Sequence, residues 1–287
     1  MMRNHTLFLA LLASSLIPFW PTAAALGDLA SGDDRYSHTI LIPFIAAGLI
    51  YLEKRRIFQA ARRGSILGGA ALAAGLLLHF GASRWPAPSG ALSIQVLAVL
   101  LTWYAAFLLC YGSRSLKAAA FPALFLLLAV PLPPGWVEKL SFTLQAASAE
   151  LSHGLFKLLG VPVFRQGHVF SLPGLVIEVA EECSGIRSTT ALIITSILAG
   201  YVFLRSGWRR LALVLATAFA AVLKNAFRIV ALSVMGAYID PAYLHGLLHH
   251  RYGGTVFSIV ALAMIAPVFL ILRRGERPAA APAQPVG

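Results

Sequence analysis

Charged residues are scarce in this sequence. Asp, Glu, Lys and Arg make up 12% of the 287 residues, about half of the share in an ordinary soluble domain. Apolar residues account for 59%, and the mean hydropathy is +0.79. This composition excludes a typical soluble globule, and it excludes a disordered chain, which would be polar and highly charged. It predicts an all-α fold: a polytopic bundle of membrane helices.

Cysteine is scarce as well. Cys110 and Cys183 are the only two, so neither a disulfide scaffold nor a thiolate zinc cluster can be built. The 24 glycines and 16 prolines follow no fixed period, which excludes collagen-like and low-complexity chains. The net charge of +12 does not by itself predict a nucleic-acid partner, because the placement of Lys and Arg matters more than their sum in a membrane protein.

Eight apolar runs approach the roughly 20 residues that a transmembrane helix needs. We expect about eight transmembrane helices in one integral membrane domain, residues 1–276, with a disordered inner tail at 277–287. A cleaved signal peptide is an alternative for the first run, because a basic residue precedes it and small residues follow it. The expected spans are 6–25, 39–53, 65–83, 91–111, 117–132, 184–204, 211–228 and 254–272.

The Lys and Arg residues predict the orientation. With the N-terminus inside, most of the 23 basic residues fall in short inner connections, as the positive-inside rule expects. The longest extramembrane segment, 132–182, then lies outside. Within it we expect an amphipathic helix over 136–159 that lies in the membrane interface, followed by short extended pieces at 161–163, 169–174 and 175–179. The apolar positions that predict this helix are Val137, Leu140, Leu144, Ala147, Leu151 and Leu155.

A cysteine with charged neighbours stands where the outer segment enters the sixth span. Ser184 is a candidate helix N-cap, which would place Cys183 beside the positive end of the helix dipole. That position, with Arg187 one turn further on, lowers a thiol pKa and enriches the nucleophilic thiolate. Glu181 and Glu182 act in the opposite sense. The alternative interpretation, a small buried hydrophobic residue, suits the other cysteine better.

Two further groups of polar residues are predicted on the same outer face. Arg228 cannot lose its proton and needs an anion, a dipole or water nearby; Asn225, three residues earlier, shares its helical face. A snorkelling interfacial arginine is the alternative. His245, His249 and His250 stand between the last two spans. The first two have the spacing of a zinc-binding pair, but no acidic partner follows the zinc-protease pattern, so a general acid or base is favoured and no metal or cofactor is expected.

Three motifs in this order resemble the exosortase family of membrane-embedded cysteine transpeptidases. They are EECSGIRS at 181–188, NxxR at 225–228 and HxxxGxxxF at 249–257. The segment DDxYSH at 33–38 is also similar to the family's first outer loop. The chain departs from the family at Glu182, where a small residue is common.

The resemblance implies a catalytic trio of Cys183, Arg228 and His249, with His250 and His245 as substitutes for His249. Glu181, Ser184, Arg187 and Asn225 would support them. It implies cleavage of secreted proteins that carry a C-terminal sorting signal: a short motif such as Pro-Glu-Pro, an apolar helix and a basic tail. A thioester acyl-enzyme would pass to water or to an amine, lipid or polysaccharide acceptor, in a bacterial inner membrane with the site facing the periplasm.

Two other classes of function stay open. A transporter or permease for exopolysaccharide export would place polar residues along a path and show broken helices in matching halves. A rhomboid-type serine protease would need a buried Ser–His pair, for which Ser184 is the candidate. Neither needs a reactive thiol, so the chemistry of Cys183 separates both from the transpeptidase.

Overall fold

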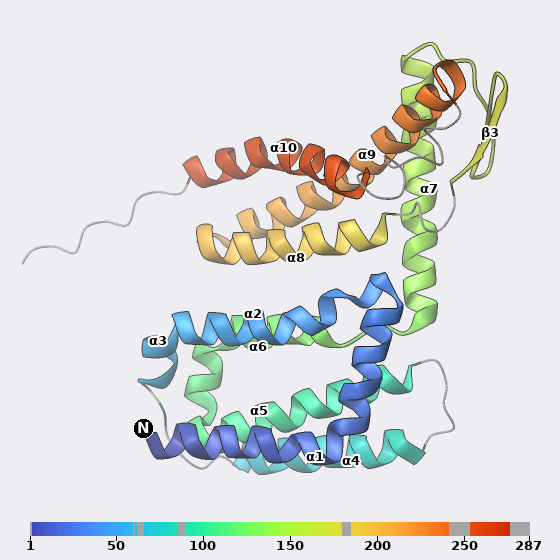
Figure 1. Cartoon of the computed structure of the whole chain (residues 1–287). Coiled ribbons are helices and arrows are strands. Elements are labelled where there is room, and N and C mark those ends of the chain that lie inside the picture. Colours follow the sequence, from blue (N-terminus) through green and yellow to red (C-terminus); the bar gives the residue numbers. More distant parts are fainter. Residues whose placement is uncertain are drawn as a thin grey trace, which may run out of the picture. The chain divides into compact units, whose positions relative to one another are not determined.

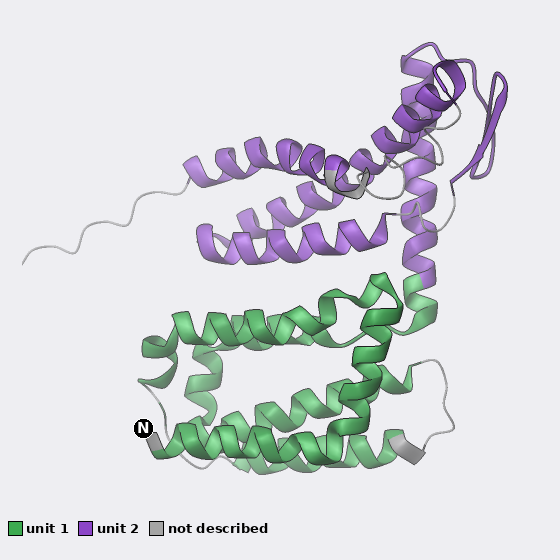
Figure 2. Ribbon diagram, in the orientation of Figure 1, with its two compact units in different colours: residues 1–137 green, residues 138–287 purple. Residues whose placement is uncertain are grey.

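The computed structural model describes residues 2–59, 61, 66–84, 90–179, 185–240 and 253–275. The chain divides into two compact units, Met1–Val137 and Glu138–Gly287 (Figure 2). The single domain expected over 1–276 stays a prediction, and the expected tail at 277–287 lies outside the described residues.

The first unit is built from helices (Figure 1). The longest are α1 and α5, and α5 packs against both α1 and α4, while α2 packs against α6. Gly112 breaks the regular backbone of α5 with a φ of +81°, a conformation that costs glycine little. The elements are α1 (Met2–Gly32), η1 (Asp34–Tyr36), α2 (His38–Leu52), α3 (Lys54–Phe58), α4 (Ile66–Arg84), α5 (Ala91–Ala118), α6 (Ala120–Leu126) and η2 (Leu127–Ala129).

The second unit combines helices with a small sheet. Helices α8 and α10 both pack against α9, with Leu192, Ala221 and Ala261 meeting in a common apolar core. The helix α7 starts at the unit boundary. The elements are α7 (Pro134–Leu158), β1 (Phe164–Gln166), β2 (Val169–Leu172), β3 (Leu175–Glu178), α8 (Ile186–Phe203), α9 (Gly207–Tyr238) and α10 (Gly253–Arg274).

The helices confirm an all-α membrane protein. Six described helices are long and apolar enough to cross a bilayer, or seven if one bent pair counts as a span. The difference from the eight expected spans has two causes. The third run lies in α4 and counts as a shorter apolar helix over Ile66–Ala82, and the fifth, Ala120–Ala129, joins α7 at a bend of 92°.

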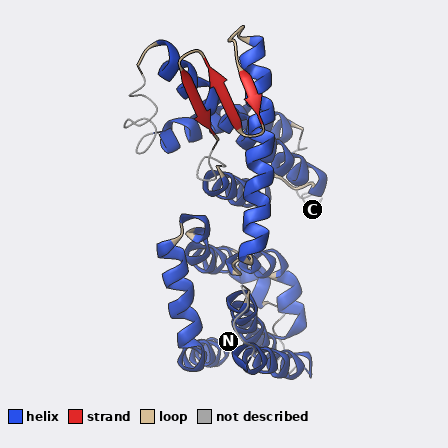
Figure 3. Cartoon of the chain, turned by 90° about the vertical axis from the view of Figure 1, so that its right-hand side faces the viewer, coloured by secondary structure: helices blue, strands red, loops and turns tan. Residues whose placement is uncertain are grey.

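The three strands form an antiparallel sheet in the order β1-β2-β3 (Figure 3). Its turns use Gly167 and Gly174, with φ of +59° and +75°, which a residue with a Cβ seldom adopts. The extended pieces expected at 169–174 and 175–179 are confirmed as β2 and β3. The piece at 161–163 was misplaced, because pairing with β2 begins at Phe164.

One face of the sheet closes a core with two helices. The alternation of β2 buries Phe170 and Leu172, which join Phe156 of α7 and Ile229 of α9 in one cluster. Burying such side chains stabilises the fold by about 1.5–3 kcal/mol each. This core anchors the sheet, and with it the chain that leads to Cys183, on α7 and α9.

The buried face of α7 contains polar residues that the apolar pattern did not point to. The helix is present as predicted, but Leu140 is 42% exposed and Ala147 is exposed. Val137, Ala149 and Phe156 are buried, and a polar stripe at spacings of four, three and four is buried beside them: Ser141, Gln145, Ser148 and Ser152. Hydrogen bonds to neighbouring elements account for the burial of the last three, as described below. That α7 lies in the membrane interface stays a prediction.

The orientation can be tested by cysteine labelling in a C110A/C183A background. Val176 in β3 is 68% exposed, and the positive-inside rule places it outside. We expect a membrane-impermeant maleimide to label V176C in intact spheroplasts. Gly207, whose added Cβ would meet no atom within 4 Å, is the matched inner position, and G207C should react only after lysis. The reverse pattern would invert the topology.

Candidate functional site

Several residues singled out by the sequence lie outside the described part of the chain. Their roles therefore stay predictions: they are Glu181, Glu182, Cys183, Ser184, His245, His249 and His250. The described ones are Arg187 on α8, with Asn225 and Arg228 on α9. Among the residues that the structure describes, no three His, Cys, Asp or Glu side chains are grouped so that they could hold a metal ion.

Asn225 lies in the interior of the second unit. Its side chain is 2% exposed, and its Nδ2 donates a hydrogen bond to Oγ of Ser148 on α7 at 3.0 Å. On another side it touches the start of α8, since a Cβ added to Gly185 would come within 3.2 Å of Asn225 Oδ1. Asn225 therefore joins α7, α9 and the residue with which the described chain resumes after Cys183.

Gly185, and not Ser184, occupies the N-cap position of α8. Its φ of +71° is left-handed, a conformation that disfavours a residue with a Cβ, and its contact with Asn225 leaves little room for one. The Gly185 carbonyl accepts hydrogen bonds from the Thr189 backbone N–H at 2.9 Å and the Ser188 hydroxyl at 3.0 Å. The motif CSGIRS therefore needs a glycine at 185 for two reasons: the left-handed backbone conformation, and the lack of room for a Cβ beside Asn225.

A buried lysine adds positive charge to the same place. Lys224 is 3% exposed, and its Nζ donates to Oγ of Ser188 at 2.6 Å. No carboxylate within the described segments pairs with it. Since Ser188 in turn donates to the Gly185 carbonyl, a chain of two hydrogen bonds runs from the ammonium group to the N-cap of α8. A buried ammonium is costly unless it is hydrogen-bonded, so Ser188 is essential to this arrangement.

The two predicted arginines differ in their surroundings. Arg228 is half-buried and stands one helical turn after Lys224 on α9, so two cations share one side of that helix. Arg187 is exposed on α8. Arg187 lies in the first turn of α8, so the positive potential near the start of this helix comes from Arg187, from Lys224 on the neighbouring helix and from the helix dipole.

The chain that precedes the candidate nucleophile is held from the other side. Val179 is 2% exposed; its N–H donates to the His168 carbonyl at 3.0 Å, and its carbonyl accepts a hydrogen bond from the Gln145 amide of α7. Ser152, one turn beyond Ser148, contacts the Ala226 carbonyl at 3.5 Å. Helix α7 thus fixes the chain directly before residue 180, and through Asn225 it supports the chain at Gly185.

Sequence reasoning gave no role to Gln145, Ser148, Ser152, Ser188 or Lys224. A signal for the α7 residues was present, because uncharged polar side chains recur there at spacings of three and four residues. Lys224 stood next to the NxxR motif, and Ser188 ended the CSGIRS motif. The hydrogen bond between Lys224 and Ser188 depends on the packing of α8 on α9, which the sequence does not show.

The upstream DDxYSH segment forms a rigid turn in the first unit. The Asp33 carboxylate caps η1 and forms an ion pair with Arg35 at 2.7 Å; the hydrogen bonds from Arg35 hold the pKa of Asp33 below its usual value. Tyr36 is buried, and its hydroxyl donates to the Leu132 carbonyl at 3.0 Å. The segment therefore fixes the start of α2 against the end of the α6 region.

The comparison with protein families gives one match. The model of the transmembrane exosortase family (Exosortase_EpsH) matches residues 29–266. No curated protein and no solved structure matches the chain. The match runs from the end of α1 to Ala266 within α10, and it includes all three motifs from which the resemblance was drawn.

The substitution G185A tests the close packing at the start of α8. A Cβ in this left-handed conformation costs about 1–2 kcal/mol, and its contact with Asn225 adds to that cost. We expect a lower thermal unfolding midpoint in detergent. The control is Gly154 on α7, which is exposed and has open space around it; G154A should raise the midpoint slightly. Equal midpoints for G185A and the wild type would contradict this account.

A double-mutant cycle tests the Lys224–Ser188 pair. The substitution S188A leaves the buried ammonium without its acceptor and should cost roughly 1–3 kcal/mol. Adding K224M removes the charge while keeping a similar volume, so S188A/K224M should be more stable than S188A. Thermal unfolding of the four proteins measures the coupling. Additive effects of the two substitutions would show that the pair contributes nothing.

Proposed function

Because the chain belongs to the transmembrane exosortase family, we propose that it is a membrane-embedded cysteine transpeptidase that cleaves C-terminal sorting signals of secreted proteins. The observation that carries this proposal is the positively charged, tightly held start of α8. Lys224 is linked to it by two hydrogen bonds, and Asn225 packs against it. The CSGIRS motif places a cysteine directly before it in the sequence.

Cys183 is proposed as the nucleophile. It stands two residues before Gly185, and two residues of chain span at most about 7 Å. A thiol within that distance of the α8 N-terminus experiences the positive end of the helix dipole and the charge of Lys224. Both favour the thiolate, which is the reactive form. Arg187 and Ser184 would contribute to the same field, and Glu181 would moderate it.

The proposed reaction follows from these residue types. His249 accepts the Cys183 proton, and the thiolate attacks the scissile carbonyl carbon of the sorting signal. Arg228 stabilises the oxyanion that forms. The carbon–nitrogen bond then breaks, the leaving amine takes the proton from His249, and the acyl group remains on sulfur as a thioester. An acceptor amine attacks the thioester and regenerates the thiol; water is the alternative acceptor.

Gln145, Ser148 and Asn225 are proposed as positioning residues. They fix Val179 and Gly185, the described residues on either side of the segment that contains Cys183. A nucleophile held at both ends loses little conformational freedom when the substrate binds, which favours a productive geometry. None of the three needs to touch the substrate for this role.

The substrate and location are proposed from the family. The substrate is a secreted protein whose sorting signal includes an apolar helix, and this helix would pack laterally against the enzyme within the lipid bilayer. The acceptor is an amine, a lipid or a polysaccharide. The location is the bacterial inner membrane with the site facing the periplasm, and nucleic acid plays no part.

A permease for exopolysaccharide export is the alternative. It predicts broken helices in two matching halves. Among the described helices, one bent pair occurs, formed by α6 and η2 with α7, and no second such pair matches it. The polar residues described above also gather at the start of α8 and do not form a path. We therefore prefer the transpeptidase.

The substitution C183A tests the proposed nucleophile. It should abolish cleavage of a reporter that ends in a Pro-Glu-Pro motif, an apolar helix and a basic tail, while expression and membrane insertion persist. The control is C110A, because Cys110 is fully buried in the first unit and should not affect the reaction. Immunoblots of membrane fractions follow the cleavage. Substantial residual cleavage by C183A would refute the cysteine mechanism.

Separate alanine substitutions of His245, His249 and His250 identify the proposed base. Adjacent residues on a helix point about 100° apart, so His249 and His250 would not both face one thiol. We expect H249A to lose processing of the same reporter and H250A to keep most of it. If H250A alone loses processing, His250 and not His249 is the base. If all three variants keep full activity, none of these histidines acts as a general base.

A further inference from the structure

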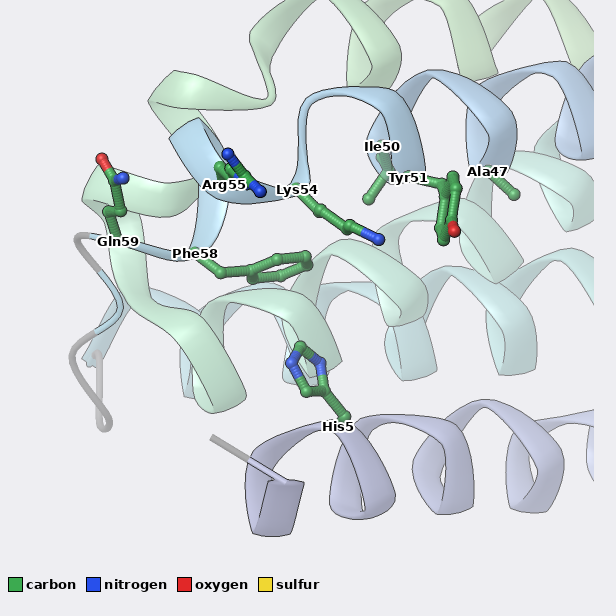
Figure 4. Close-up of a pocket in the computed structure, with 8 residues that line it drawn as sticks. All are labelled: His5, Ala47, Ile50, Tyr51, Lys54, Arg55, Phe58 and Gln59. Atoms are coloured by element: carbon green, nitrogen blue, oxygen red, sulfur yellow. The ribbon is translucent and has the colours of Figure 1, made fainter.

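A pocket with a basic rim lies in the first unit, whereas the CSGIRS, NxxR and HxxxGxxxF motifs belong to the second unit. Its volume is about 550 Å³, and it is open to the surface (Figure 4). His5 of α1, Tyr51 of α2, and Lys54, Arg55 and Phe58 of α3 line it, together with apolar residues of α2. No acidic residue is among those that line it.

The cations of the rim are available for an anion. Glu53, the nearest carboxylate in the sequence, pairs with Arg56 at 2.6 Å, and Arg56 also donates to the Ala118 carbonyl at 2.7 Å. Lys54 and Arg55 form no ion pair with any described carboxylate. Lys54 Nζ instead lies 3.9 Å from the centre of the Tyr51 ring, a contact that leaves its N–H groups able to donate.

The interior of the pocket is apolar and firmly supported. The Phe58 ring packs on His5 and Tyr111, with centroids 4.9 Å and 4.7 Å apart. His5 Nδ1 is 2.8 Å from the Tyr111 hydroxyl. Ala47 and Ile50 extend the apolar wall along α2. A cationic rim above an apolar wall matches a molecule with an anionic head and a hydrocarbon tail.

The position of the pocket narrows the choice of ligand. It lies at the C-terminal end of α2 and the N-terminal end of α1, two helices that are long and apolar enough to span a bilayer. Such ends lie at the level of the lipid headgroups. Basic pockets between membrane helices at this level bind acidic lipid headgroups.

We propose that this pocket binds an acidic phospholipid. Lys54 and Arg55 donate hydrogen bonds to its phosphate, and one acyl chain lies along Ala47 and Ile50. The positive-inside rule assigns the site to the inner leaflet. The lipid would hold together the ends of α1, α2 and α3. This binding does not depend on the proposed peptidase chemistry.

Titration of the detergent-solubilised full-length protein tests the site. Native mass spectrometry with dioleoyl phosphatidylglycerol should show one tightly bound lipid, and K54Q/R55Q should weaken its binding roughly 25-fold, the effect of two cations. The matched control, R114Q/K117Q, removes two exposed basic residues that do not line the pocket. It should bind as the wild type does. Equal weakening in both variants would overturn the proposal.

Two further arms separate the sources of the anion. Dioleoyl phosphatidylcholine, which has the same tails and no net charge, should bind far more weakly. Inorganic phosphate should not compete at millimolar concentration; if it displaces the lipid, the pocket is a site for free phosphate. The variant A47W fills the apolar wall without changing the charge, and it should also weaken lipid binding. Unchanged binding by A47W would place the lipid elsewhere.

Discussion

The burial of polar side chains inside an apolar helical bundle is the constraint on which the candidate site depends. Lipid offers no partner to a buried polar group, so each must find one in the protein. Lys224 and Asn225 are consecutive on α9 and 3% and 2% exposed. Because neighbours on a helix point about 100° apart, they bond to different helices: Lys224 to Ser188 on α8, and Asn225 to Ser148 on α7. Gly185 packs against Asn225 directly and is linked to Lys224 through the Ser188 hydroxyl.

The sequence was sufficient to locate the helices and most of the sheet. Long apolar runs have few alternatives to a membrane helix, which is why seven of the eight expected spans each coincide closely with one helix; the fifth is divided between the end of α5, α6 and η2. The Pro173-Gly174 turn predicted the boundary between β2 and β3 for a similar reason, since this pair strongly favours a tight turn. The family was also readable, because the CSGIRS motif is specific and the other two motifs follow it in order.

The contacts of α7 were not predictable in the same way. Its apolar positions predicted an interfacial helix, but they did not reveal that the face buried in the protein includes Ser148 and Gln145. In a membrane protein, lipid is itself an apolar environment, so hydrophobic periodicity does not reveal which face meets protein, and small polar residues often pack between helices. The N-cap of α8 was also misassigned. Serine favours this position by residue type, so Ser184 was expected there. The N-cap is Gly185, because Asn225 from α9 approaches it too closely for a residue with a Cβ.

The site and the family match support one chemistry, in which a thiol beside a positively charged helix start attacks a peptide bond near the membrane surface. The most direct test is to trap the acyl-enzyme. The purified protein would be mixed with a sorting-signal peptide near neutral pH, without an acceptor amine, then quenched in acid and analysed by intact-mass and peptide mass spectrometry. The account predicts a hydroxylamine-sensitive adduct on Cys183, with the mass of the N-terminal fragment of the peptide. Cleavage without such an adduct, or an adduct on another residue, would contradict it.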